Sequence, residues 1–155
     1  MKTYRQGAVG ALMDEYERVV AELEGILEEI SDADFELVRD TETRDENCRS
    51  IQTILTHVVG AGYGYAGMMR DAWGMERVGR MYEPMTRSEA PGRLAAMLEY
   101  TRATLEGHWD LSEDEANAMK MQSGWGQLYD FEQLFEHAIV HVMRHRRQIE
   151  RFLKR

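Results

Sequence analysis

Cysteine, proline and long apolar runs are all scarce in this sequence. Cys48 is the only cysteine, so no disulfide can form within the chain and a disulfide-stabilised secreted fold is excluded. Only two of the 155 residues are proline, and Val, Ile and Thr rarely alternate with polar residues, which favours helices over strands. No stretch approaches the roughly 20 apolar residues that cross a bilayer, and the N-terminus lacks the apolar segment of a signal peptide. We therefore expect a helical, cytoplasmic protein with no membrane partner.

Basic residues are also in deficit. The chain has 28 acidic against 19 basic residues, a formal net charge of -9, and no basic stripe. Nucleic acid is therefore not an expected partner, because binding to phosphates needs positive charge. The length suits one folded domain, which we expect to span residues 1–155.

Apolar residues recur at intervals of three and four in four long segments, which is typical of amphipathic helices. We expect the helices at about residues 5–30, 51–73, 87–107 and 130–153, and a short helical turn at 112–115. Ser50 is a plausible N-cap, and Thr86–Glu89 and Ser112–Glu115 fit capping boxes. Four such helices and no convincing strand predict an all-α four-helix bundle. Either long loop, after the first helix or before the last, could carry a crossover, so the handedness stays open.

The second helix contains four glycines, Gly60, Gly62, Gly64 and Gly67, although each costs up to about 1 kcal/mol of helix propensity relative to alanine. One interpretation is that they allow close approach of a neighbouring backbone. The other is that they leave room for a ligand beside His57.

Three histidines stand four residues apart near the C-terminus: His137, His141 and His145. Residues at this spacing lie on one face of a helix. On a helical wheel His145 falls well inside the apolar arc, His141 near its margin and His137 just outside it. His57 lies at the edge of the apolar arc of the second helix. His57, His141 and His145 are therefore the candidate metal ligands, with His137 at the rim as a candidate catalytic residue.

The alternative for any single histidine is a solvated or hydrogen-bonded side chain, which is our interpretation of His108. Two histidines in an apolar stripe need partners, however, because an unpaired buried polar group costs roughly 1–3 kcal/mol. Other metal chemistries fail on spacing: no histidine is preceded by Glu at the third position, and His-Glu-x-x-His is absent. No Gly-rich phosphate loop or Gly-x-Ser-x-Gly elbow occurs. Cys48 lies in a polar segment and is interpreted as an incidental thiol.

Two segments carry a family resemblance. Residues 135–149, which end in His145-Arg146-Arg147-Gln148-Ile149, resemble the last helix of the DinB-like superfamily, and residues 50–58 resemble its second-helix segment. The resemblance implies a four-helix bundle, commonly a homodimer, with zinc or nickel held by His57, His141 and His145. Relatives include S-transferases that use low-molecular-weight thiols and a thiol-dependent maleylpyruvate isomerase. Arg147 departs from the glycine that is frequent in this family.

The hypothesis is a metal-dependent S-transferase that joins a small-molecule thiol to an electrophile, or a related hydrolase in which water replaces the thiol. Candidate pocket residues are Tyr63, Tyr65, Trp125, His137 and Arg144. Because only neutral imidazole binds a metal, affinity should fall below about pH 6.5. The alternative is a noncatalytic bundle that binds a partner or ligand, with a structural metal or none. Chelation should unfold such a protein but leave a catalytic bundle folded.

Overall fold

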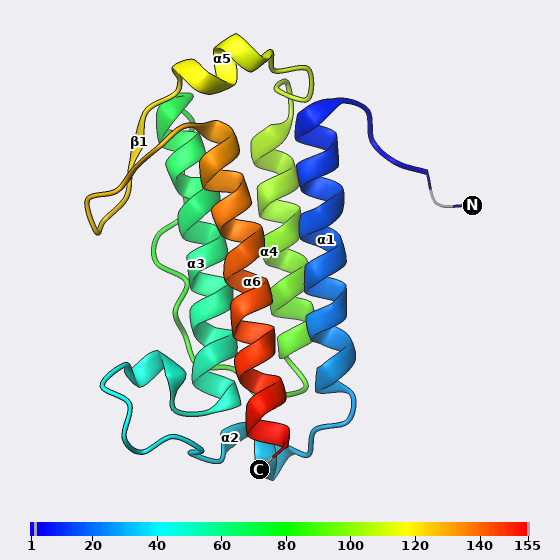
Figure 1. Cartoon of the computed structure of the whole chain (residues 1–155), viewed down its shortest axis with the longest axis vertical. Coiled ribbons are helices and arrows are strands. Elements are labelled where there is room, and N and C mark those ends of the chain that lie inside the picture. Colours follow the sequence, from blue (N-terminus) through cyan, green and yellow to red (C-terminus); the bar gives the residue numbers. More distant parts are fainter. Residues whose placement is uncertain (2, 155) are drawn as a thin grey trace.

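The computed structural model describes residues 1 and 3–154, and four long helices form its body. These are α1 (Gly7–Leu27), α3 (Ile51–Ala72), α4 (Ala90–Leu105) and α6 (Phe131–Leu153). They pack in a ring in which α1 contacts α6, α6 contacts α3, α3 contacts α4 and α4 contacts α1. The all-α bundle is confirmed, and Figure 1 shows α3 and α6 side by side along its length.

The short elements lie at the two ends of the bundle (Figure 1). One end carries α2 (Asp32–Glu36) and the 3-10 turn η1 (Glu46–Cys48), and the other carries α5 (Glu113–Ala118). A hairpin of β1 (Met121–Gln122) and β2 (Leu128–Tyr129) precedes α6 and was not predicted. Strands of two residues are too short for periodicity to reveal.

The long helices begin and end close to the residues expected from the sequence, and their capping residues explain these boundaries. Ser50 caps α3 and shares a capping box with Thr53, and Ser112 caps α5 in the box expected with Glu115. The Thr86–Glu89 box also forms, with Glu89 N–H donating to Thr86 Oγ1 at 3.3 Å and Thr86 N–H to the Glu89 carboxylate at 2.8 Å. It closes a turn, however, and α4 begins only at Ala90.

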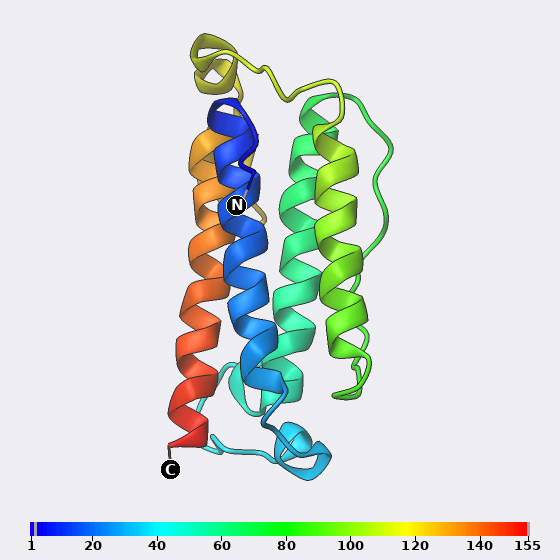
Figure 2. The same cartoon turned by 90° about the vertical axis from the view of Figure 1, so that its right-hand side faces the viewer.

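The crossover lies in neither of the two loops that we considered. Figure 2 shows α3 and α4 as one pair and α1 and α6 as another, and within each pair the helices run in the same direction. Since α3 and α4 are parallel, residues 73–89 must return along the whole bundle to connect them (Figures 1 and 2). Helical periodicity carries no information on the direction of a helix, so the sequence did not indicate this connection.

The glycines of α3 make room for side chains rather than for a neighbouring backbone. A Cβ at Gly60 would meet the Tyr82 ring at 2.4 Å, and one at Gly67 would meet the Arg77 guanidinium at 2.6 Å. Both residues belong to the 73–89 connection, which therefore lies directly against α3. Gly62 faces α4, where a Cβ would lie 2.1 Å from Met97 Sδ. Nothing lies within 4 Å of a Cβ at Gly64, so only this glycine leaves open space.

This difference predicts opposite effects for two alanine substitutions in one helix. Gly64→Ala should raise the free energy of unfolding by up to about 1 kcal/mol, because helix propensity improves and nothing is displaced. Gly62→Ala should lower it, because Met97 is fully buried and must repack, at a cost of about 1–3 kcal/mol. Urea denaturation of both variants measures this. A stabilised Gly62→Ala would contradict the close approach of Met97 to Gly62.

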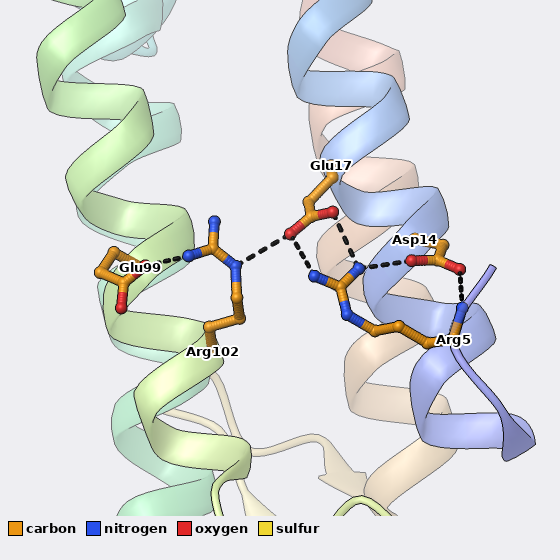
Figure 3. Close-up of polar contacts among 5 residues, drawn as sticks. All are labelled: Arg5, Asp14, Glu17, Glu99 and Arg102. Carbon is orange, nitrogen blue, oxygen red and sulfur yellow. Dashed lines mark hydrogen bonds and ion pairs between the residues drawn. The ribbon is translucent and has the colours of Figure 1, made fainter. Parts of the chain in front are cut away.

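An ion-pair network joins the start of the chain to α1 and α4. Figure 3 shows Glu17 between two arginines: Arg5 donates to its carboxylate at 2.9 Å, and Arg102 of α4 donates to the same carboxylate at 2.9 Å. Arg5 also pairs with Asp14, and Arg102 with Glu99. Partial burial acts to raise the pKa of Glu17, but the bonds from Arg5 and Arg102 lower it overall. Such half-exposed pairs stabilise a fold modestly.

None of the helices in the described part of the chain combines the length and the apolar content needed to cross a bilayer.

Candidate metal centre

The three predicted ligands come together at the seam between α3 and α6. His57 lies in the first half of α3, and His141 and His145 lie one turn apart on α6. Ser50 and Asp130 cap these two helices and define where each begins. Buried neighbours such as Ile54, Val58, Ala138 and Val142 then orient the histidine faces toward the seam.

The convergence involves the same atom of each ring. His57 Nε2 lies 3.0 Å from His141 Nε2, and His145 Nε2 lies 3.2 Å from it. One nitrogen from each ring therefore falls within 4.8 Å of the other two, a spacing at which three side chains could hold one metal ion. In the described part of the chain no other group of three His, Cys, Asp or Glu has this spacing.

The hydrogen bonds of the rings fit a shared cation. His145 Nδ1 lies 3.1 Å from Gln148 Oε1. A carbonyl oxygen only accepts, so Nδ1 carries the proton and the Nε2 lone pair of His145 faces the other two rings. His141 Nδ1 is buried without a partner among the described residues, so this ring makes its polar contacts through Nε2. A metal ion would satisfy all three Nε2 atoms at once.

Burial keeps these imidazoles in the ligating, neutral form. It lowers the pKa of His141 to about 3, with further lowering by His145 and His57 nearby. Burial also lowers the pKa of His57 and of His145, although Asp45 and Gln148 respectively act in the opposite direction. Neutral imidazole is the form that binds metals.

The depths of the histidines differ from the helical-wheel prediction. The wheel placed His145 deepest, whereas His141 is only 9% exposed and His145 is half-buried. The Tyr65 ring stands at 80° to His141, with the ring centroids 5.7 Å apart. His145 instead lies where a cavity opens on the surface. A wheel describes one helix and cannot include the residues that cover it.

Gln148 is expected to position His145, so its substitution should weaken metal binding. Gln148→Leu removes the acceptor that holds the His145 proton on Nδ1, and losses of such partners typically weaken metal binding by about 10–100-fold. Zinc affinity by competition with a chromophoric chelator measures the change. Gln148→Glu keeps an acceptor and should retain affinity. Equal affinity of the Leu variant and wild type would contradict the role.

A cavity of about 610 Å³ opens on one side of the histidine cluster and has an aromatic wall. His57 and His141 line it, as do four residues predicted for the pocket: Tyr63, Tyr65, Trp125 and His137. The 73–89 connection supplies Arg77, Arg80 and Tyr82, and Gly64 lies in its wall. These three connection residues were missed because an irregular segment has no periodicity. We call this space the aromatic cavity.

His137 lies in the aromatic cavity, outside the three converging rings. Its Nδ1 is 3.4 Å from the Tyr129 hydroxyl, and the Tyr65 and Trp125 rings stand 5.3 and 5.7 Å away between centroids. Burial, and then Arg144, lower its pKa. Its place agrees with the expected rim of the site. His108, by contrast, stacks on Trp73 at 3.7 Å between centroids, away from both cavities.

A second cavity, also of about 610 Å³, opens on the other side of the cluster. His57 and His141 line this cavity too, together with His145 and three arginines of α6: Arg144, Arg147 and Arg151. We call it the arginine cavity. Arg144 was predicted as a pocket residue. Cys48 also lines this cavity, beside the histidines, although it lies in a polar segment with no histidine adjacent to it in the sequence.

Comparison with known proteins agrees with this architecture. The DinB family model matches residues 3–155, so the chain belongs to the DinB family. No curated protein matches the chain in sequence. Among solved structures, the crystal structure of a mycothiol-dependent maleylpyruvate isomerase is similar, with a TM-score of 0.58 and 18% sequence identity. The similarity covers 96% of this chain but only 63% of that one, and it supports a shared fold.

Proposed function

We propose that this protein holds zinc or nickel through His57, His141 and His145 and transfers a low-molecular-weight thiol to an electrophile. The observation that supports this most directly is the convergence of three Nε2 atoms where two cavities meet. Three imidazoles leave further coordination positions for a reactant, unlike a closed structural site. The similarity to a thiol-dependent enzyme agrees with a thiol reactant. The homodimer expected from the family stays a prediction.

A divalent ion bound there would hold a coordinating thiol as the thiolate, which is the nucleophilic form. The residues of the chain supply the rest. When His137 Nδ1–H donates to the Tyr129 hydroxyl, its Nε2 lone pair is free to take the proton that the thiol loses. The aromatic cavity would hold an apolar electrophile against Tyr65 and Trp125 and limit the access of water. If water replaced the thiol, the same residues would support hydrolysis.

The rival function is a noncatalytic bundle with a structural metal. Chelation distinguishes the two, because the buried core includes residues of all four long helices and does not depend on the histidine cluster. We expect the apoprotein to stay folded by circular dichroism while thiol transfer is lost. Unfolding on chelation would favour the structural role.

The test of transfer uses a panel of small thiols with chlorodinitrobenzene and the metal-loaded protein. We expect thiol-dependent turnover that Gly64→Trp reduces at least about tenfold, because the indole fills the aromatic cavity. Gly25→Trp is the matched control, since Gly25 of α1 also has open space but lines neither cavity. No turnover with any thiol, or an equal effect of both substitutions, would contradict the proposal.

A further inference from the structure

The wall of the arginine cavity is rich in positive charge, although the protein as a whole is acidic. Arg144, Arg147 and Arg151 follow one another at intervals of three and four on α6, which puts them on one helix face. All three line the cavity that His57, His141 and His145 also line. Three guanidinium groups thus stand beside the candidate metal ligands in a chain of net charge -9.

These three arginines have no acidic partner among the residues that the structure describes, within 4 Å. Arg146, on another face of α6, is different: it pairs with Glu22 of α1 and lies 3.5 Å from Glu150. The arginine cavity has one acidic residue in its wall, Asp45, and its carboxylate accepts hydrogen bonds from Asn47 N–H at 3.0 Å and Cys48 Sγ at 3.4 Å. Asp45 can offset one of the three positive charges, so the wall of the cavity keeps a net positive charge.

We infer that the arginine cavity binds the carboxylate groups of the thiol substrate, so that the substrate is an acidic thiol. This inference rests on the proposed function. A guanidinium matches a carboxylate with two parallel N–H donors, and such charge-assisted pairs are stronger than neutral hydrogen bonds. A thiol held by its carboxylates in this cavity would present its sulfur to the histidine cluster.

The other reactant then belongs on the opposite side. The aromatic cavity contains His137, the residue proposed to accept the thiol proton, and its wall is richer in aromatic rings. His57 and His141 contact both cavities, so a sulfur at the cluster is reachable from the aromatic side. The two reactants would meet at the histidines without sharing a cavity.

Three small molecules separate the contributions of the thiol and the carboxylates. Mercaptosuccinate has a thiol and two carboxylates, methylsuccinate replaces the thiol with a methyl group, and thioglycerol has a thiol and no carboxylate. Calorimetry would measure the binding of each molecule to the zinc-loaded protein. Mercaptosuccinate should bind at least about tenfold more tightly than thioglycerol, and added salt should reduce that advantage because the arginines are exposed.

The decisive variant replaces Arg144, Arg147 and Arg151 with glutamine. It should remove the advantage of mercaptosuccinate over thioglycerol and abolish methylsuccinate binding, with metal content unchanged. Arg146→Gln is the matched control, because it removes a charge from the same helix but not from the cavity. Because mercaptosuccinate can also chelate zinc through a carboxylate, an advantage that survives the triple substitution would overturn the inference.

The outcomes distinguish this inference from the proposed function. If both thiols bind equally to the wild type, the acidic substrate is wrong while thiol binding stands. If thioglycerol does not bind and mercaptosuccinate binds no more tightly than methylsuccinate, with the binding of both acids dependent on the arginines, the thiol function fails and the cavity remains a carboxylate site. If methylsuccinate binding is also absent, or equal in the triple variant, the carboxylate site is wrong as well.

Discussion

Replacing both His141 and His145 with alanine is expected to abolish stoichiometric zinc or nickel binding. The double variant leaves only His57 of the three converging imidazoles, in which the Nε2 atoms of His57 and His145 lie 3.0 and 3.2 Å from His141 Nε2. The loss should exceed the roughly 100-fold upper range seen when only a ligand's hydrogen-bond partner is removed. Elemental analysis of protein purified without a polyhistidine tag measures the metal content.

The matched control for this experiment is His137→Ala. His137 lies one turn from His141 on the same helix and belongs to the same aromatic cavity, but not to the converging group. This variant should keep its metal and lose thiol transfer. Circular dichroism checks that both variants fold. A double variant with the metal content of the wild type would show that the ion, if bound, is held elsewhere.

Acidification is expected to destabilise the apoprotein through His141. Its pKa is about 6.5 in the unfolded chain but is lowered to about 3 in the folded protein, chiefly by burial. Between these values the unfolded chain binds a proton that the folded protein does not. The stabilising contribution is therefore complete above about pH 6.5 and decreases as the pH falls. From pH 7 to pH 5 the loss is about 2 kcal/mol from this residue.

Urea denaturation of the apoprotein at several pH values, beside His141→Leu, isolates this effect. Leucine fills the buried site without titrating, and the remaining groups titrate in both proteins. The variant should therefore lose about 2 kcal/mol less than the wild type between pH 7 and pH 5. Parallel losses in the two proteins would contradict the buried, neutral state of His141. The lowered pKa values also move the expected fall in metal affinity to a pH below 6.5.

The histidine cluster could be predicted because helix geometry determines it. A spacing of four residues places His141 and His145 on one face, and the apolar arc of α3 directs His57 to the seam with α6. The recurrence of apolar residues at intervals of three and four predicted the four-helix bundle in the same way. The order of burial was wrong because it depends on Tyr65, which a wheel of α6 does not contain.

Apart from Trp125, which lies in the β1–β2 hairpin, the residues of the cavity walls could be predicted only where helices form the walls. Tyr63, Tyr65 and Arg144 lie on α3 and α6, and the pattern of those helices indicated them. Tyr82 and Cys48 reach the cavities from irregular segments, whose paths depend on tertiary packing. The return path of residues 73–89 depends on two helices being parallel, which no periodicity encodes.

The pairing of the helices also determines which parts of the protein a bound metal ion would connect. His57 belongs to the α3–α4 pair, whereas His141 and His145 belong to the α1–α6 pair. Metal loading would therefore cross-link the two helix pairs across the contact between α3 and α6. Amide hydrogen exchange in the middle of α3 and α6 should then slow more on loading than exchange at the α1–α4 contact.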